Sequence, residues 1–137
     1  MNHKDTKTQR EPIPDGANEV ARRVVDAAYA VHCALGPGLL ETVYEACLEY
    51  ELKKRGTKVQ RQVPVPLVYD GMKLDADLRL DIVVENCLVV ELKAVETLLP
   101  VYEAQLLTYM RLSGFRVGLL INFNVPLIKD GIKRMVL

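Results

Sequence analysis

The sequence predicts an α/β (α+β) fold in which a central mixed sheet of about four to five strands is flanked by helices. Three observations support this. Apolar residues recur at helical spacing through the N-terminal part, and a valine-rich middle part alternates between turn dipeptides. A third helical segment then precedes a continuous apolar run. The expected order of elements is α-α-β-β-β-α-β, with one more short strand at the end.

Three segments have the period and the end signals of helices. The first runs from Asn18 to Leu35 and is stopped by Gly36-Pro37-Gly38. The second extends from about Leu39 to Arg55, just before a glycine. The third begins at Pro100 and ends at Gly114, and proline is favoured where a helix begins and glycine where it ends.

The first strand segment, Lys58 to Tyr69, is rich in valine but contains Pro64 and Pro66. Because proline cannot donate a hydrogen bond to a neighbouring strand, this segment suits an edge strand or a strand interrupted partway. The dipeptide Asp70-Gly71 that follows is a strong hairpin turn signal.

The remaining strands follow from alternation and from apolar runs. Leu78 to Val84 alternates apolar and polar residues, Glu85-Asn86 turns the chain, and Cys87 to Lys93 returns. Val117 to Phe123 is apolar throughout, as in a buried strand, and Ile132 to Leu137 adds the last short strand.

Length and composition indicate a single domain. The chain has 137 residues, of which 50% are hydrophobic, so it has enough apolar material for one core. We expect residues 17–137 to form this domain and residues 1–16, polar and of mixed charge, to be a flexible tail. The half-apolar composition of so small a chain suggests a homodimer.

Charge and cysteine content restrict the partners and the compartment. Lysine plus arginine equals aspartate plus glutamate at 18 each, so a nucleic-acid partner must be held by a local patch. The three cysteines lack the paired spacing of zinc or redox sites, which favours buried thiols in a reducing, cytoplasmic environment. No apolar run approaches the roughly 20 residues of a membrane helix, and no membrane partner is expected.

The hairpin formed by the second and third strands gathers charged residues. If Asp81 lies opposite Glu91, the flanking leucine, isoleucine and valine residues form one apolar face, and Asp81, Glu91 and Lys93 share the other. Two carboxylates are a sufficient anchor for Mg²⁺, and an adjacent ammonium could hold a phosphate or assist an attacking water. The alternative is a solvated strand face with an incidental ion pair.

Three residues on the helices are further candidates. Glu41 lies in the first turn of the second helix, where an acid is also favourable at a helix N-terminus. Gln105 and Tyr109 are four residues apart and face the same way on the third helix, where they could equally be a surface amide and a core aromatic.

A basic run follows the second helix and could bind phosphates. Phosphate contacts supply most non-specific affinity for nucleic acids. The alternative is that these cations complement the dipole at the helix C-terminus. The residues of this basic run are Lys53, Lys54, Arg55, Lys58 and Arg61.

The order of these motifs resembles the PD-(D/E)xK nuclease superfamily. A helix bearing a glutamate precedes D…ExK on a hairpin, and QxxxY follows on the next helix. The stretch GLLETVY, together with LRLDIVVENCLVVELKAVE and GLLINF, is similar to the GxxExxY proteins, a single-domain branch of that superfamily. One departure is that no proline precedes Asp81, which instead follows Leu80.

The resemblance implies a PD-(D/E)xK-like core and roles for the candidates. Asp81 and Glu91 would bind Mg²⁺ (or Mn²⁺), with Glu41 completing the metal's inner or outer shell. Lys93 would orient or activate the water. Gln105 and Tyr109 would position Lys93 and the substrate backbone, as in the exonuclease-like subgroup.

Two functions are compatible with these features. The first is a Mg²⁺-dependent nuclease that hydrolyses phosphodiester bonds of DNA or RNA. The second is a catalytically silent nucleic-acid-binding or adaptor module that keeps the fold. Neutral charge and small size favour the second, whereas retention of the whole acidic and basic signature favours the first, because clustered carboxylates are costly to bury without a metal.

Overall fold

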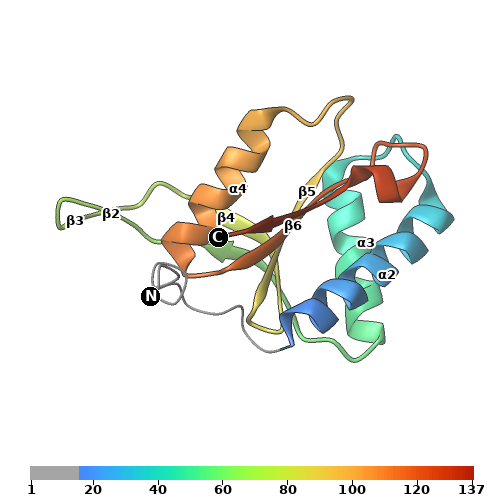
Figure 1. The fold of residues 1–137 in the computed structure, drawn as a ribbon, viewed down its shortest axis with the longest axis horizontal. Coiled ribbons are helices and arrows are strands. Elements are labelled where there is room, and N and C mark those ends of the chain that lie inside the picture. Colours follow the sequence, from blue (N-terminus) through green and yellow to red (C-terminus); the bar gives the residue numbers. More distant parts are fainter. Residues whose placement is uncertain (1–15) are drawn as a thin grey trace, which may run out of the picture.

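The computed structural model describes residues 16–137, so the expected N-terminal tail lies almost wholly outside the described residues. Three helices and a five-stranded sheet make up the body of the molecule (Figure 1). The helices are α2 (Ala17–Leu35), α3 (Glu41–Lys54) and α4 (Pro100–Ser113). Their bounds agree with the sequence prediction to within two residues.

The main sheet has the strand order β1-β4-β5-β6-β7. Only β5 and β6 run parallel, and the other neighbours are antiparallel, so the sheet is mixed as predicted. A single turn of 3-10 helix, η1 (Ile128–Gly131), precedes the last strand. The strands are β1 (Val59–Pro64), β4 (Arg79–Val84), β5 (Leu88–Lys93), β6 (Val117–Asn122) and β7 (Ile132–Val136).

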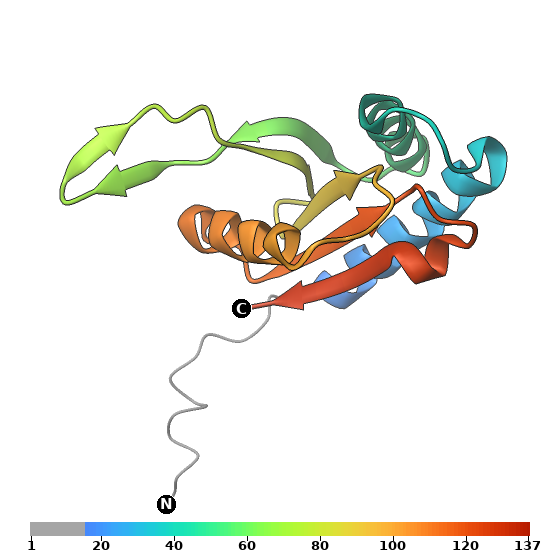
Figure 2. The same ribbon diagram turned by 90° about the horizontal axis from the view of Figure 1, so that it is seen from above.

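Helices cover both faces of the sheet. Helices α2 and α3 lie on one face and α4 on the other (Figures 1 and 2). Each face has its own apolar cluster: Ile82, Val90 and Leu92 pack with α2 and α3, whereas Val83 and Val89 pack with α4. Because β5 and β6 are covered on both faces, they read as apolar runs rather than as alternating strands.

The hairpin between β4 and β5 has the predicted register over its inner part. Ile82 lies opposite Val90 and Val84 lies opposite Leu88. Glu85 and Asn86 both have a positive φ, 51° and 55°, as the central residues of a type I′ turn require, and the Cys87 N–H donates to the Val84 carbonyl at 3.0 Å.

The apolar face of β4 reverses near Asp81, which differs from the prediction. Leu80 was expected beside Ile82 but packs in the cluster under α4. The paired strand β1 reverses at the same level: Gln62 has a φ of 54°, and Arg61 and Gln62 both reach Glu45 of α3. Two successive residues then face the same way, and the alternation is inverted beyond them.

The segment between β1 and β4 forms a separate two-stranded sheet that the sequence did not predict. Strands β2 (Leu67–Tyr69) and β3 (Met72–Leu74) pair around the predicted Asp70-Gly71 turn. This β2–β3 arm extends away from the body of the molecule (Figure 2). Interruption of the first strand segment at Pro64 and Pro66 is confirmed, and β1 is an edge strand as expected.

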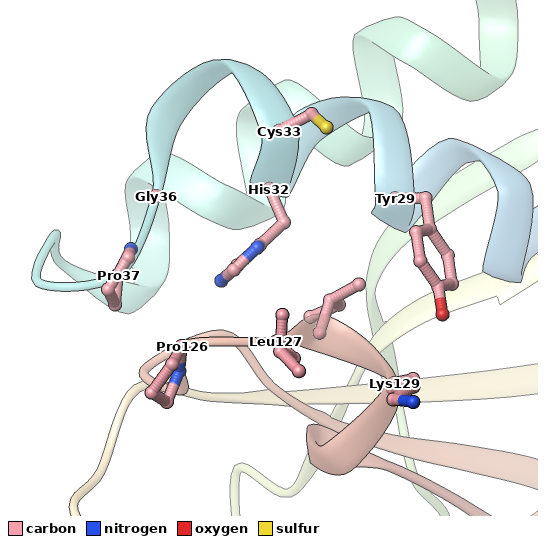
Figure 3. Close-up of a pocket in the computed structure, with 9 residues that line it drawn as sticks. Tyr29, His32, Cys33, Gly36, Pro37, Pro126, Leu127 and Lys129 are labelled. Atoms are coloured by element: carbon pink, nitrogen blue, oxygen red, sulfur yellow. The ribbon is translucent and has the colours of Figure 1, made fainter.

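A cavity of about 360 Å³ lies between the end of α2 and the segment around η1 (Figure 3). His32 and Cys33 line it from α2, and Pro126 and Leu127 from the opposite side. His32 Nε2 lies 2.8 Å from the Val125 carbonyl oxygen, so this histidine ties α2 to that loop. Among residues 16–137, no helix is long and apolar enough to cross a membrane.

Candidate active site

Asp81 lies where β4 separates from β5. The paired ladder between these strands ends at Ile82 and Val90, one residue before Asp81 would meet Glu91. There the Leu92 N–H donates a hydrogen bond to Asp81 Oδ2, at 2.9 Å. We call this opening the β4–β5 fork. The aspartate side chain therefore takes a backbone donor of β5 and is fixed beside that strand.

Glu91 is a buried acid on the central strand β5. It lies opposite Leu120 of the parallel strand β6 and is only 8% exposed. Its Oε1 atom is buried and has no hydrogen-bond partner within residues 16–137. A buried polar group without a hydrogen-bond partner lowers the stability of the fold by on the order of 1–3 kcal/mol, and a charged group lowers it by more.

Lys93 is held at the end of β5 by an aromatic ring. Its Nζ lies 4.5 Å from the centre of the Tyr102 ring of α4. In the described part of the chain, no carboxylate forms an ion pair with this ammonium. The chain beyond Lys93 is fixed by Asn122, whose side-chain amide bonds to both the N–H and the carbonyl of Val95, at 3.1 and 2.9 Å. The lysine thus stands near the acids without being neutralised by direct contact.

Burial raises the pKa of both fork carboxyls. The pKa of Asp81 is raised to about 6, first by burial and then by the negative charges of Glu45 and Glu41, against the hydrogen bond from Leu92. The pKa of Glu91 is raised to about 8 by burial and by the charge of Asp81, against the attraction of Lys93. Asp81, Glu91 and Lys93 thus influence one another electrostatically, although the predicted pairing of Asp81 with Glu91 is not part of the ladder.

Glu41 enters the same electrostatic field from α3. It is partly buried, and its pKa is raised by burial and by Glu45, whereas Lys93 lowers it. The helix start is fixed by Tyr44, the tyrosine of the GLLETVY stretch. The Tyr44 hydroxyl donates to the Gly36 carbonyl at 2.6 Å and accepts from the Leu39 N–H at 3.1 Å. Tyr44 is therefore a structural residue that sets the position of Glu41.

Glu45 is a further acid near Asp81 that was not predicted from the sequence. It is 4% exposed and receives hydrogen bonds from Arg61 Nε at 2.8 Å and Gln62 Nε2 at 3.1 Å. The sequence feature that could have indicated Glu45 is its place in a row of glutamates on one helix face, Glu41, Glu45 and Glu49, spaced four residues apart. The partners of Glu45 could not be anticipated, since they depend on the reversed alternation in β1.

Gln105 and Tyr109 lie together on α4, on the side that also carries Tyr102. Gln105 Nε2 donates to the Tyr109 hydroxyl at 3.2 Å. Both residues and Tyr102 line one open hollow. Their connection to the acids runs through Tyr102 and Lys93, and a direct role in the site stays a prediction. Tyr102 itself was missed, although it stands three residues before Gln105 and so shares its helix face.

Most of the basic run is paired with glutamates. Lys53 pairs with Glu49 at 3.0 Å, and Lys54 and Arg55 pair with Glu51 at 3.2 and 2.7 Å. Arg61 is held by Glu45, as described above.

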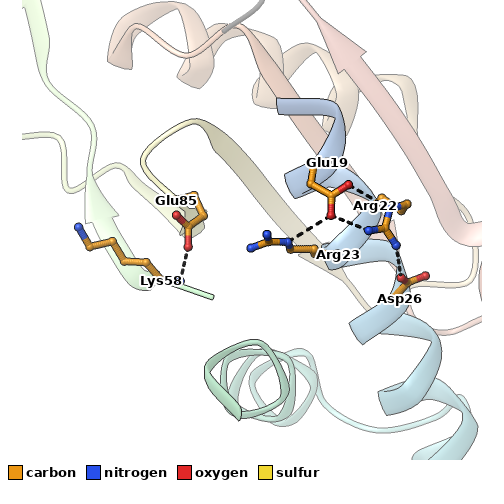
Figure 4. A network of polar contacts seen from close by, with 6 residues as sticks. All are labelled: Glu19, Arg22, Arg23, Asp26, Lys58 and Glu85. Carbon is orange, nitrogen blue, oxygen red and sulfur yellow. Dashed lines mark hydrogen bonds and ion pairs between the residues drawn. The ribbon is translucent and has the colours of Figure 1, made fainter. Parts of the chain in front are cut away.

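Lys58 differs from the rest of the basic run, because it is bound through its backbone. The Lys58 N–H donates to Glu85 Oε2 at 2.7 Å, while a separate network joins Glu19, Arg22 and Asp26 on α2 (Figure 4). A phosphate-binding role for the basic run stays a prediction.

The residues of the fork fit a hard divalent cation held by few protein ligands. Within residues 16–137, no group of three or more His, Cys, Asp and Glu side chains is arranged to hold a metal ion. Mg²⁺, however, is usually bound through one or two carboxylates and keeps several waters. The Glu91 oxygen that lacks a partner, beside the Asp81 carboxylate, is the donor set that such an ion would satisfy.

The family model of the PD-(D/E)XK nuclease superfamily matches residues 18–135. The chain belongs to this superfamily. No curated protein and no solved structure matches the chain significantly. The mixed five-stranded sheet with helices on both faces is consistent with the PD-(D/E)XK nuclease-like fold. Asp81 lies on β4, and Glu91 and Lys93 lie on β5, the two strands that separate at the fork.

Proposed function

We propose that the protein is a Mg²⁺- or Mn²⁺-dependent nuclease that hydrolyses phosphodiester bonds of DNA or RNA. The observation that carries the proposal is the buried, unpartnered oxygen of Glu91 next to Asp81, with Lys93 close by. Burying two mutually repelling carboxylates costs stability, and a bound cation would offset that cost. The GLLETVY stretch further supports placement in the GxxExxY branch.

Each residue of the site has a proposed role. Asp81 and Glu91 would hold the ion, and Glu41 from α3 would complete its inner or outer shell. When bound, such an ion supplies charge stabilisation at the scissile phosphate and a more acidic water. Lys93, whose ammonium lies over the Tyr102 ring, would stabilise the negative charge that develops on the phosphate. Gln105 and Tyr109 help to order that side of α4.

Partners and location follow from the same features. Nucleic acid is the proposed partner, with the basic run as a secondary contact surface. The described cysteines, Cys33, Cys47 and Cys87, are all free thiols, which supports a cytoplasmic setting. A homodimer is proposed from the exposed apolar residues of the β2–β3 arm, which include Tyr69 at 71% and Met72 at 53% exposure.

One observation favours the alternative, a catalytically silent binding or adaptor module. The glutamates of α3 neutralise most of the basic run, so the surface expected to bind a nucleic-acid backbone is weak. In this alternative the chain keeps the fold, but Lys93 has no catalytic role.

A cleavage screen separates the two functions. Single- and double-stranded DNA and RNA are incubated with the protein in Mg²⁺, in Mn²⁺ and in chelator. We expect metal-dependent cleavage that falls by at least about 100-fold in Lys93→Ala, since one transition-state contact is commonly worth that much. Lys73→Ala on the exposed β2–β3 arm serves as the matched control and should retain full activity. Activity that survives both chelator and Lys93→Ala would contradict the proposal.

A further inference from the structure

We propose that the hollow on α4 beside Lys93 is a nucleobase-binding subsite, and that the substrate is a single strand or an unpaired nucleotide rather than an intact duplex. The inference rests on the proposed function and specifies its substrate class. It assigns to Tyr102, Gln105 and Tyr109 a contact with the base, in addition to ordering Lys93.

The hollow is an open depression of about 480 Å³ along α4, lined by residues of that helix. Its volume falls within the roughly 300–1,000 Å³ of ordinary ligand sites. Two aromatic rings and one amide supply the groups that could recognise a ligand. The lining residues are Val101, Tyr102, Ala104, Gln105, Thr108 and Tyr109.

This combination of groups matches the chemistry of a base. Aromatic side chains stack on bases of any sequence, and each such contact contributes about 1–3 kcal/mol. The Gln105 amide, which already donates to the Tyr109 hydroxyl, can exchange hydrogen bonds with a base edge. Val101 is 61% exposed, so the hollow also presents apolar surface that a base would cover.

The position of the hollow relates it to the scissile phosphate. Tyr102 lines the hollow and also carries the Lys93 ammonium at 4.5 Å from its ring centre. If Lys93 faces the phosphate, the base in the hollow belongs to a nucleotide adjoining that phosphate. A base inside a duplex has both faces covered by its neighbours, and therefore only an unpaired or extruded base could enter.

The charge distribution points in the same direction. A protein that holds a duplex relies on many phosphate contacts from lysine and arginine. Here Lys53, Lys54, Arg55 and Arg61 are all paired with glutamates, and the whole chain has equal numbers of basic and acidic residues. Affinity that phosphate contacts do not supply must come from another source, and stacking in the hollow provides one.

The test measures binding without turnover. Oligonucleotides bearing one 2-aminopurine are titrated with the protein in Ca²⁺, as single strands and as duplexes, in DNA and RNA forms. Stacking on a tyrosine quenches the 2-aminopurine, which reports contact with the base itself. The variants are Tyr109→Leu, which removes the ring, and Tyr109→Phe, which keeps it. Tyr50→Leu is the control, since Tyr50 is an exposed tyrosine on another helix, α3, and does not line the hollow.

We expect single strands to bind at least about fivefold more tightly than duplexes and to be quenched. Tyr109→Leu should lose at least about fivefold in affinity together with the quenching, whereas Tyr109→Phe and Tyr50→Leu should keep both. Thermal unfolding of each variant confirms that it is folded, and Gln105→Ala gives a second, exposed-site variant with the same expected direction.

Two outcomes distinguish this inference from the proposed function. If the protein cleaves duplexes as well as single strands, and the Tyr109 and Gln105 variants bind like the wild type, the subsite is overturned while the nuclease stands. If single strands are bound and quenched through Tyr109 but no metal supports cleavage, the subsite stands and the nuclease is overturned.

Discussion

At Glu91, a carboxyl that is 8% exposed lies in the middle of an apolar sheet next to a second acid. The residues on either side of it in β5, Val90 and Leu92, are fully buried. Burial and the charge of Asp81 both favour the neutral acid, so without a cation the folded protein keeps a proton on Glu91 to a higher pH than the unfolded chain does.

This difference predicts how stability depends on pH in chelator. The contribution of Glu91 is intact below its ordinary pKa of 4.5 and is lost as the pH rises to about 8. Urea unfolding should therefore give a lower free energy at pH 9 than at pH 5, by on the order of 2 kcal/mol. Glu91→Gln should remove most of this decline, because an amide does not ionise.

Glu96→Gln provides the control for this measurement. Glu96 is exposed in the loop beyond β5, so the variant should keep the wild-type decline. A wild-type free energy of unfolding that is constant between pH 5 and pH 9 would show that folding does not raise the pKa of Glu91.

At the scale of elements, the sequence could predict what local chemistry dictates. The helix ends at Gly36 and Gly114 and the turn at Glu85-Asn86 were correct, because each depends on neighbouring residues alone. The inner hairpin register was correct because a one-residue slip would bury charges.

What the sequence did not predict depends on contacts between distant segments. Leu80 packs under α4 where β4 and its partner β1 both reverse, at a level where Gln62, eighteen residues earlier, has a left-handed backbone. The ladder stops at Ile82 because Asp81 accepts a hydrogen bond from Leu92. Neither contact follows from periodicity, and the roles of Glu45 and Tyr102 depend on the same geometry.

The β2–β3 arm is an element that the domain should not need for folding. It forms its own sheet, and isolated two-stranded hairpins are marginal in water. The Val65 N–H bonds to the Leu78 carbonyl at 2.8 Å, so the chain is already closed beneath the arm. Replacing residues 66–77 by Asn-Gly should leave the thermal midpoint within about 5 °C of the wild type. This shift corresponds to a change in the free energy of unfolding on the order of 1 kcal/mol.

Circular dichroism and thermal melts of this arm-less variant check the prediction. Matched replacement of the Glu85-Asn86 turn by Gly-Gly, within the main sheet, should keep the same fold and serves as the control. Loss of cooperative unfolding on removal of the arm would show that the arm supports the core.

At the scale of the whole molecule, the sheet separates two different surfaces. One face carries α2 and α3 with their glutamate–cation pairs, and the other carries α4 with its aromatic hollow. The fork between β4 and β5 carries Asp81 and Glu91 between these layers, and Lys93 and Glu41 approach it from β5 and α3. The fold thus brings acids from three elements within electrostatic influence of one another, although net charge is zero.

This charge arrangement predicts weak dependence of nucleic-acid binding on salt. The logarithm of affinity for a single strand should fall with the logarithm of salt concentration with a slope of about −1 to −2, because only two or three phosphates are neutralised. Fluorescence anisotropy in Ca²⁺ over a range of NaCl concentrations measures the slope. A slope of about −4 or steeper would show that the basic run is the main contact surface.

The most direct test of the metal site is calorimetric titration of Mn²⁺ into the metal-free protein. We predict one binding event per chain, accompanied by proton release that increases as the pH is lowered from 8 toward 6, because the raised pKa values of Asp81 and Glu91 mean that the ion must displace protons. Asp81→Asn should abolish binding, whereas Asp77→Asn on the exposed segment before β4 should bind like the wild type. Absence of binding at millimolar Mn²⁺, or equal binding by Asp81→Asn, would contradict a metal-dependent active site at the fork.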